Sequence, residues 1–288
     1  MNEFRSIFEA AAYGKIDEVK RYLEVGIDVN KGDEAGYTPL HWAVQEGYLE
    51  LVIYLINQGA DVNIRDIDGF LPIEIACTKG NFDIVKMLCV SGADLTIHRN
   101  HYTPLHSAAA TGRDEIVRFL IEKGMDVNKC DYSGYTPIHW ATQERHLKVI
   151  KLLVELGGKL ETKDDEGSTP MYIAAAEGYL EIVSYFISKK INIDPINEGS
   201  SSCTPLCIAS VYDHYDVVEI LINNGSNLES KDTRGRTPLY NAAINNRIEI
   251  VKLLLKYGAN RDVKDKRGKR ITDIRRPIIK QEILELLI

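Results

Sequence analysis

The chain has 288 residues, of which 44% are hydrophobic and 27% charged, a balance typical of soluble folded proteins. Its formal net charge of −7 argues against nucleic acid as the main partner. The N-terminus leads straight into an amphipathic segment, and no apolar run of about 18 residues follows, so we expect neither a signal peptide nor membrane insertion.

A proline recurs along the chain at a nearly constant interval. The steps are 33, 32, 33, 33, 35 and 33 residues, between Pro39, Pro72, Pro104, Pro137, Pro170, Pro205 and Pro238. A step of 33 residues back from the first proline reaches Ser6, and a step forward from the last reaches Ile271. The same register therefore runs from end to end, which indicates a repeat array that grows along one axis.

Each repeat predicts two helices and an extended loop. A Thr before the proline is a good N-cap, and the proline suits the first helical position. The first helix, of about eight residues, ends at a glycine suited to the left-handed conformation. Arg145, Asp213 and Asn246 replace this glycine, and we expect Arg145 and Asp213 to cost some stability. The second helix has apolar residues at helical spacing, for example Leu49 and Val52, and ends at another glycine.

Two stretches of eight residues, 36–43 and 134–141, differ only at Leu40 versus Ile138. They contain Thr-Pro-Leu/Ile-His-Trp-Ala, and residues 59–63 read Gly-Ala-Asp-Val-Asn. These motifs resemble the ankyrin repeat, and the resemblance covers essentially the whole chain. It implies an all-α solenoid of stacked helix-turn-helix units with β-hairpin-like loops. It also implies a binding module, usually for another protein, without catalysis or a cofactor of its own.

We expect a single repeat domain over residues 1–288. It would comprise an N-terminal cap repeat at 1–31, seven internal repeats over 32–264 and a partial C-terminal capping repeat at 265–288. A helix is predicted over Pro277–Ile288, and its apolar residues would cover the last repeat, because terminal repeats must close the core.

Residues 261–280 hold nine Lys or Arg and three Asp, so this segment is strongly basic in an otherwise acidic chain. The segment could bind a ligand of its own, although such charge runs usually face water.

Two connections depart from the regular period. The short step comes from a missing residue around Arg99–Tyr102, where Asn100 is expected to take the left-handed conformation. The long step comes from residues 195–203, a connection whose Gly and Ser content predicts mobility.

The sequence contains no phosphate-binding loop, no His-Glu-x-x-His and no Gly-x-Ser-x-Gly motif, so we expect no enzyme. Two groups are weak candidates for a metal site, and neither has a second pair at zinc spacing. They are His98, His101 and His106, and Cys203, Cys207 and His214. We therefore expect no bound metal.

His41, His106 and His139 occupy one repeat position, and the ankyrin resemblance implies that this histidine forms structural hydrogen bonds. Asn63 and Asn128 each lie eight residues after a Leu. The ankyrin resemblance implies that such asparagines can be modified by an oxygen-dependent hydroxylase, as in animal ankyrin repeats. A turn hydrogen bond is the favoured alternative for these two asparagines.

The five cysteines are odd in number and irregular in spacing, which favours a reducing compartment such as the cytoplasm. Abundant Ile, Lys and Asn would suit an AT-rich bacterium, a protozoan or a virus, so delivery into a host cytosol stays open.

The candidate binding residues lie two before and three after the proline, with acids at the end of the first helix. The candidates are Tyr37, Trp42, Glu46, Phe70, Tyr102, Tyr135, Trp140 and Glu144. The ankyrin resemblance places these positions on or near a concave face, where large aromatic side chains are typical binding anchors. The alternative is that the rings pack between neighbouring hairpins. Three repeats separate Trp42 from Trp140, roughly 30 Å by helix spacing, which would suit a protein or an extended peptide.

The sequence thus predicts a non-enzymatic adaptor, scaffold or effector, monomeric, that binds a partner protein. The alternative is a targeting scaffold that brings a separate catalytic protein to its substrate.

Overall fold

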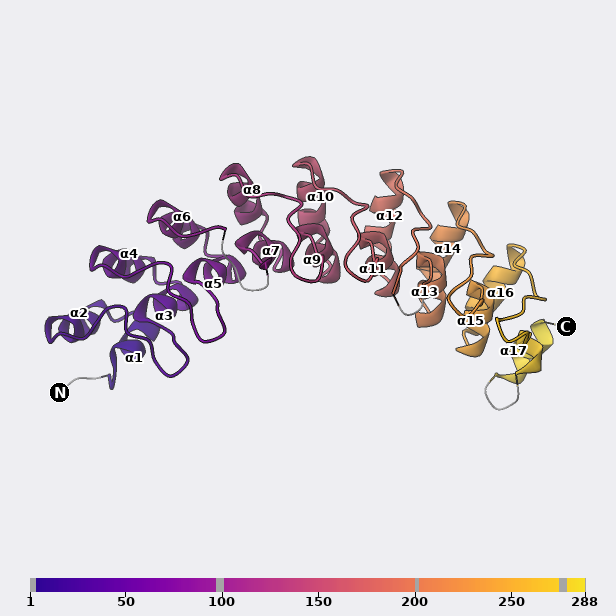
Figure 1. Ribbon diagram of the computed structural model, residues 1–288, viewed down its shortest axis with the longest axis horizontal. Coiled ribbons are helices and arrows are strands. Elements are labelled where there is room, and N and C mark those ends of the chain that lie inside the picture. Colours follow the sequence, from indigo (N-terminus) through magenta and orange to yellow (C-terminus); the bar gives the residue numbers. More distant parts are fainter. Residues whose placement is uncertain (1–3, 97–100, 200–201, 275–278, 288) are drawn as a thin grey trace. The chain divides into compact units, whose positions relative to one another are not determined.

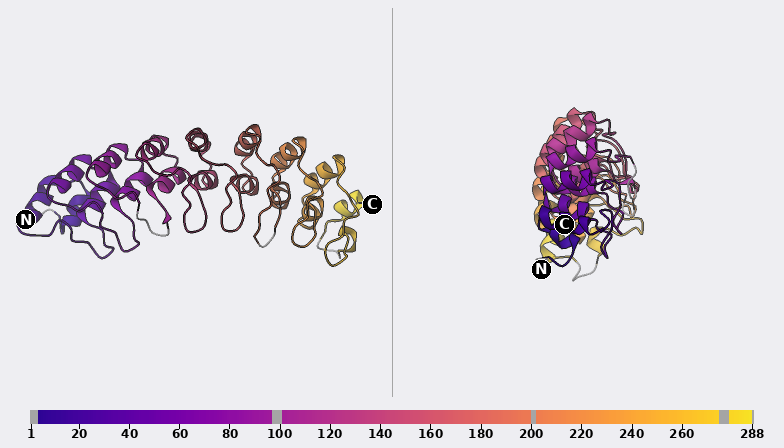
Figure 2. Two further views of the ribbon diagram at one scale, coloured as in Figure 1. Left: turned by 45° about the horizontal axis from the view of Figure 1, so that its top comes forward. Right: turned by 90° about the vertical axis from the view of Figure 1, so that its left-hand side faces the viewer.

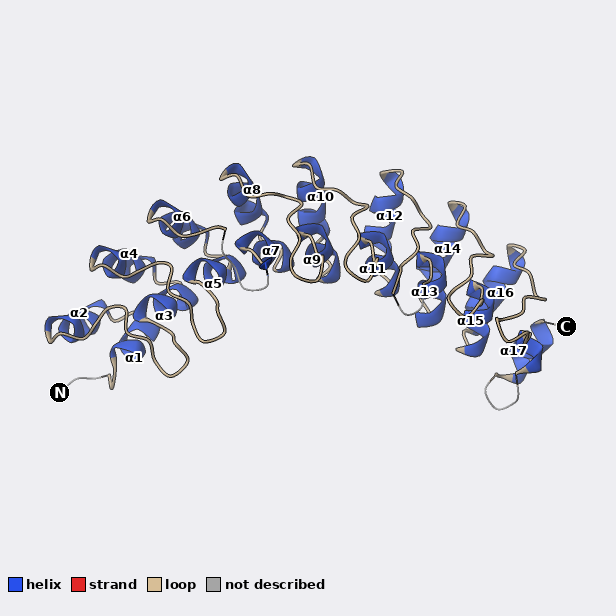
Figure 3. Cartoon of the chain, in the orientation of Figure 1, coloured by secondary structure: helices blue, strands red, loops and turns tan. Residues whose placement is uncertain are grey.

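The computed structural model describes residues 4–96, 101–199, 202–274 and 279–287, and these residues form helices joined by loops, without β-strands (Figures 1 and 3). The first helices of the repeats are α1 (Ile7–Ala12), α3 (Pro39–Glu46), α5 (Pro72–Lys79), α7 (Pro104–Ala110), α9 (Pro137–Gln143), α11 (Pro170–Ala176), α13 (Pro205–Tyr212) and α15 (Pro238–Ile244). The second helices are α2 (Ile16–Glu24), α4 (Leu49–Asn57), α6 (Phe82–Val90), α8 (Asp114–Glu122), α10 (Leu147–Glu155), α12 (Leu180–Ser188), α14 (Tyr215–Asn223) and α16 (Ile248–Lys256). The 3-10 helix η2 (Ile271–Asp273) and α17 (Gln281–Leu286) follow. The predicted all-α repeat fold is confirmed.

The chain forms two compact units. Unit 1 comprises residues 1–132 and 148–157, and unit 2 comprises residues 133–147 and 158–288. In unit 1, α1, α3, α5 and α7 pack side by side, as do α4, α6 and α8. In unit 2, α9, α11, α13 and α15 pack side by side, as do α12, α14 and α16. Within each unit the loops that join successive repeats lie beside the row of first helices (Figure 2). That the whole chain is one domain stays a prediction.

Capping residues fix where the first helices begin. Thr38, Thr169 and Thr204 accept a hydrogen bond from the backbone N–H three residues later, and a proline follows each of them. Leu71 breaks this pattern, and there the Glu74 carboxylate accepts from the Leu71 N–H at 2.8 Å instead. The predicted Thr-Pro starts are confirmed except at Leu71, where Glu74 accepts the N-cap N–H in the way that the repeat histidine does elsewhere.

The predicted left-handed helix ends are also confirmed. Gly47 has φ 81° and Gly80 has φ 82°. The three replacements keep the same geometry, with φ 61° at Arg145, 72° at Asp213 and 58° at Asn246. Asn100 lies outside the described residues.

A strained position that the sequence analysis missed follows α12. Lys190 has φ 57° where the other second helices are followed by glycine, for example Gly157 with φ 95°. Its side chain is exposed, and a Cβ in the left-handed region costs about 1 kcal/mol or more.

Lys190→Gly should therefore stabilise the protein by about 1 kcal/mol. The matched control is Lys189→Gly one residue earlier, where φ is −84° and glycine only adds freedom to the unfolded chain. Urea denaturation measures both variants. A lower midpoint for Lys190→Gly than for the wild type would contradict the strain at this site.

Small and branched apolar side chains build the core. Ala43 and Ala108 on the first helices are fully buried, and their size lets neighbouring first helices approach closely. Val52, Leu55 and Leu120 on the second helices are equally buried. No helix in the described part of the chain combines the length and apolar character needed to span a bilayer.

The C-terminal cap is shorter than predicted. Helix α17 begins at Gln281, because its N-cap Lys280 has an extended backbone (φ −62°, ψ 143°) and donates its N–H to Asn246 Oδ1 at 2.7 Å. Residues 277, 278 and 288 lie outside the described part. Helix α17 packs on α16, and Ile283 and Leu287 are buried there.

Candidate protein-binding surface

An aspartate six residues before the proline builds each regular hairpin. Asp33 donates its N–H to Tyr37 O at 3.0 Å, and its Oδ1 accepts from Tyr37 N at 2.9 Å. The same pairing recurs between Asp66 and Phe70. Adjacent hairpins are joined by the Ile67 N–H, which donates to Ala35 O at 3.0 Å. The residue two before the proline therefore has a fixed backbone from which to present its side chain.

Tyr37 and Trp42 form one cluster in unit 1, held by contacts inside their own repeat. The Tyr37 ring centroid is 5.3 Å from that of Trp42 and 5.3 Å from that of His41. The Trp42 Nε1–H donates to Asp33 Oδ2 at 2.9 Å. The indole thus bonds to the aspartate that builds the hairpin, while Tyr37 and Trp42 stay only half-buried.

The phenol of Tyr37 lies among acidic side chains. Burial raises its pKa, and the carboxylates of Asp66, Asp68 and Asp33 raise it further. The hydroxyl therefore stays neutral at physiological pH and can donate a hydrogen bond to a partner.

Tyr135 and Trp140 form the equivalent cluster in unit 2. Their ring centroids are 5.5 Å apart at 54°, against 5.3 Å and 53° for Tyr37 and Trp42. The Tyr135 ring also lies 5.3 Å from His139. One sequence motif therefore builds one geometry twice, and both rings are again half-buried.

The remaining predicted site residues are less tightly organised. Phe70 is 40% exposed on its hairpin, and Tyr102 stacks on His106 at 5.4 Å. Glu46 and Glu144 are exposed at the ends of α3 and α9. Tyr37, Trp42, Glu46, Phe70 and Tyr102 therefore belong to unit 1, and Tyr135, Trp140 and Glu144 to unit 2.

The third residue after the proline is more buried, and so less accessible to a partner, than the sequence suggests. Only the two tryptophans keep exposed surface there, whereas the other five residues are buried. These five are Ile75, Ser107, Ile173, Ile208 and Asn241. Asn241 is fixed in the way that Trp42 is, since its Nδ2 donates to Asp232 Oδ2 at 3.1 Å. This position is mainly structural, and a tryptophan is large enough to extend beyond it.

The repeat histidines have the structural role that the family resemblance implies. His106 Nδ1 accepts from the Thr103 N–H at 3.0 Å, which assigns the ring proton to Nε2. That Nε2–H then donates to Lys129 O at 2.9 Å. In unit 2, His139 Nδ1 accepts from Thr136 N, and its Nε2 contacts Ser168 O at 3.3 Å. The Nδ1 bonds hold each hairpin against the helix that follows it, and the Nε2 bonds hold that helix against the hairpin of the next repeat.

Burial lowers the pKa of His41, and this shift sets a pH dependence. Above the ordinary pKa of 6.5 the ring is neutral in both folded and unfolded chains. Below it the unfolded chain takes up the proton first, so stability is lost as the pH falls from 6.5 through the lower folded value. His41→Gln should reduce the drop in urea midpoint between pH 7.5 and pH 5.5. An unchanged drop would contradict the burial effect.

The hairpin asparagines form bonds between repeats. Asn63 Nδ2 donates to Gly92 O at 3.0 Å, and its Oδ1 accepts from Asp94 N at 2.8 Å. Asn128 Nδ2 donates to Gly157 O at 3.1 Å. These asparagines therefore form structural hydrogen bonds, which run between repeats rather than within one turn.

A second series of inter-repeat bonds escaped the sequence analysis. The ninth residue after the proline reaches back to a carbonyl at the end of the preceding first helix. Asn81 bonds to Val44 O at 3.3 Å, Tyr179 to Gln143 O at 3.3 Å and Arg247 to Val211 O at 3.0 Å. The residue type changes while the acceptor stays among the last residues of the preceding first helix, so only the repeat register could have revealed this series.

Of the residues weighed as metal ligands, His106, His214, Cys203 and Cys207 contact other residues of the chain, and His101 is exposed. Tyr172 Oη lies 3.8 Å from Cys203 Sγ, and Asn241 Nδ2 donates to Cys207 Sγ at 3.1 Å. His98 lies outside the described part. Within the described ranges no group of three His, Cys, Asp or Glu side chains is placed to hold a metal ion.

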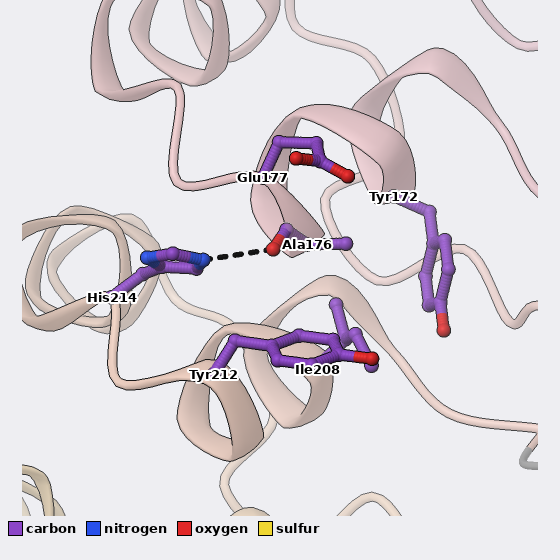
Figure 4. Close-up of a pocket in the computed structure, with 6 residues that line it drawn as sticks. All are labelled: Tyr172, Ala176, Glu177, Ile208, Tyr212 and His214. Atoms are coloured by element: carbon purple, nitrogen blue, oxygen red, sulfur yellow. Dashed lines mark hydrogen bonds between the residues drawn. The ribbon is translucent and has the colours of Figure 1, made fainter. Parts of the chain in front are cut away.

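A pocket opens on unit 2 between the ends of α11 and α13 (Figure 4). Its volume is about 490 Å³, and it is lined by Tyr172, Ala176, Glu177, Ile208, Tyr212 and His214. His214 Nε2 donates to Ala176 O at 2.8 Å and closes one side, as the ninth residue after Pro205. The carboxylate of Glu177 and the ring of Tyr212 lie on opposite sides of the opening (Figure 4).

Comparisons with known proteins agree with this geometry. The sequence model described as ankyrin repeats (3 copies) matches residues 7–99, 73–164, 156–232 and 197–267. The chain is similar to acyl-CoA-binding domain-containing protein 4 of Oryza sativa subsp. japonica, with 43% identity over 51 residues. It is 40% identical over 52 residues to protein phosphatase 1 regulatory subunit 27 of Homo sapiens, and 44% identical over 52 residues to ankyrin repeat-containing protein P1E11.10 of Schizosaccharomyces pombe. Each match covers 18% of this chain and spans 15%, 34% and 25% of the three relatives.

Proposed function

Because this chain belongs to the ankyrin repeat family, we propose that it is a non-enzymatic adaptor, scaffold or effector. It binds a partner protein or an extended peptide through its hairpins and the adjacent side of its first helices. Ankyrin repeats generally mediate protein–protein interaction, so the class of function follows from the family. The surface and the kind of partner are the proposal.

The repeated tyrosine–tryptophan cluster is the observation that supports this surface most. Both clusters keep half-buried rings in nearly the same geometry, at 5.3 Å and 5.5 Å. Intra-repeat contacts hold the rings in place before any partner arrives, and such rigid aromatic side chains bind with little loss of conformational entropy. The exposed ring of Phe70 extends the surface in unit 1.

A targeting scaffold is the second candidate, in which the array brings a separate catalytic protein to its substrate. One similar protein is named as a regulatory subunit of protein phosphatase 1, and this supports the candidate. We place the chain in the cytoplasm, because its five cysteines are free thiols. That it is a monomer is part of the same proposal. Action in a host cytosol remains part of this proposal.

Affinity capture with mass spectrometry tests the function. The intact chain should enrich a protein that a chain with both tryptophans replaced does not. An enzyme captured together with its substrate would favour the targeting scaffold. Reproducible absence of any enriched protein would contradict both candidates.

A further inference from the structure

The pocket between α11 and α13 has the chemistry of a guanidinium site. We propose that it binds an arginine side chain carried by the partner protein. This inference rests on the proposed function only in assigning the arginine to a protein partner. It adds a residue type for that partner and a second contact area on unit 2.

Glu177 supplies the negative charge. Its side chain is exposed at the end of α11, and in the described part of the chain it forms no salt bridge. Its contact with Gln143 is a long hydrogen bond of 3.5 Å. Both carboxylate oxygens can therefore accept from an incoming guanidinium, which matches a carboxylate in a bidentate pair.

Tyr212 supplies a ring face. The side chain is 56% exposed at the last position of α13, and the next residue, Asp213, turns the chain away with φ 72°. A large aromatic ring with this exposure has free surface on which a planar cation can stack. Figure 4 shows this ring facing the space below Glu177.

The chain already uses this arrangement elsewhere in unit 2. The Arg145 guanidinium carbon lies 5.5 Å from the centre of the Tyr179 ring, and that of Arg236 lies 5.4 Å from the centre of the Tyr240 ring. Each pair places an arginine over a tyrosine near the same row of first helices. Tyr212 has an equivalent ring, and no arginine of the described residues lies over it; in the proposal the arginine that covers it comes from the partner protein.

The charges around the pocket leave Glu177 available. Asp213 pairs with Arg247 at 3.5 Å, so this aspartate and this arginine largely offset each other. Burial raises the pKa of Tyr179, and the carboxylates of Glu177 and Glu144 raise it further, while Arg145 lowers it. Glu177 is exposed and forms no salt bridge in the described part of the chain, so its carboxylate supplies the negative charge of the pocket.

The shape of the pocket favours arginine over lysine. Ile208 and the ring of Tyr172 provide apolar walls for an aliphatic stem. Burial raises the pKa of Tyr172, as does its contact with Cys203, so this wall stays uncharged. A flat guanidinium can contact the carboxylate and the ring together, whereas an ammonium is a hydrated point charge.

The test is a nuclear magnetic resonance titration of the full chain with acetyl-Gly-Arg-Gly-amide. Matched peptides carry lysine or the neutral analogue citrulline in place of arginine. The arginine peptide should shift the amide signals of Glu177 and Tyr212 and saturate. Lysine should bind more weakly, and citrulline should give no saturable shift.

Four variants locate the site. Glu177→Gln should weaken arginine binding at least about tenfold, because a charge-assisted pair is lost. Tyr212→Ala should weaken it about threefold, through loss of the ring contact. Glu181→Gln and Tyr215→Ala, on the exposed faces of α12 and α14, should leave binding unchanged.

Equal binding of arginine and lysine, any saturable shift with citrulline, or undiminished binding to Glu177→Gln would overturn the proposal. Circular dichroism of each variant separates loss of binding from loss of fold. The peptide experiment does not require the natural partner. Failure of peptide binding would therefore contradict the arginine site alone, and failure of partner capture would contradict the proposed function alone.

Discussion

Replacing both tryptophans, Trp42→Ala and Trp140→Ala, should abolish partner capture while the helical content stays that of the wild type. Central aromatic residues of a protein interface each contribute about 2 kcal/mol or more to binding, so two losses exceed about a thousandfold. The fold should survive, because Asp33 keeps its hydrogen bonds to the backbone of Ala35 and Tyr37 without the indole.

The matched control removes two half-buried rings from second helices, one in each unit, as Tyr54→Ala with Tyr185→Ala. This control should retain capture. Affinity capture quantified by mass spectrometry and circular dichroism measure both pairs. Equal capture by the tryptophan variant and the wild type would show that the rings serve the fold alone.

Ile283→Ala should destabilise the C-terminal repeat by about 2–5 kcal/mol. Ile283 is fully buried on the face of α17 that packs on α16, and its loss leaves a cavity at the end of the array. The exposed ion pair of Lys252 with Glu282, at 3.1 Å, contributes little by comparison. Deleting residues 277–288 should have the larger effect, exposing the last repeat and lowering solubility.

Glu285→Ala is the control for the cap, since this side chain is exposed on the same helix and should change stability by less than about 0.5 kcal/mol. Thermal unfolding followed by circular dichroism measures the series. A deletion variant with the solubility and melting temperature of the wild type would contradict a capping role for α17.

The repeat period was sufficient to predict the positions of the helices. Thr38 and Pro39 predict a helix start by local chemistry, and Gly47 predicts its end, so no distant contact is needed to place α3. The same local rule fails at Leu71, whose side chain cannot accept a hydrogen bond, and there the Glu74 carboxylate accepts from the Leu71 N–H. The left-handed conformation of Lys190, with φ 57°, was also not predicted, because a lysine at this position gives no indication of it.

The candidate surface could be predicted only in part. The spacing of Tyr37 and Trp42 placed them in one repeat, but the bond from the indole to Asp33 depends on the hairpin geometry. Burial of Ile75 and Ile208 depends on packing between repeats, which periodicity does not measure. The pocket beside Glu177 combines residues from two repeats with different side chains, so no single motif indicates it.

Cross-linking mass spectrometry of the captured complex tests most directly which side of the repeats binds the partner. Lysines occur on both sides: Lys31 and Lys163 are exposed on hairpins, Lys151 and Lys252 are exposed on second helices, and Lys86 is half-buried on a second helix. The proposed surface predicts partner cross-links at Lys31 and Lys163. Cross-links confined to the lysines of the second helices would contradict it.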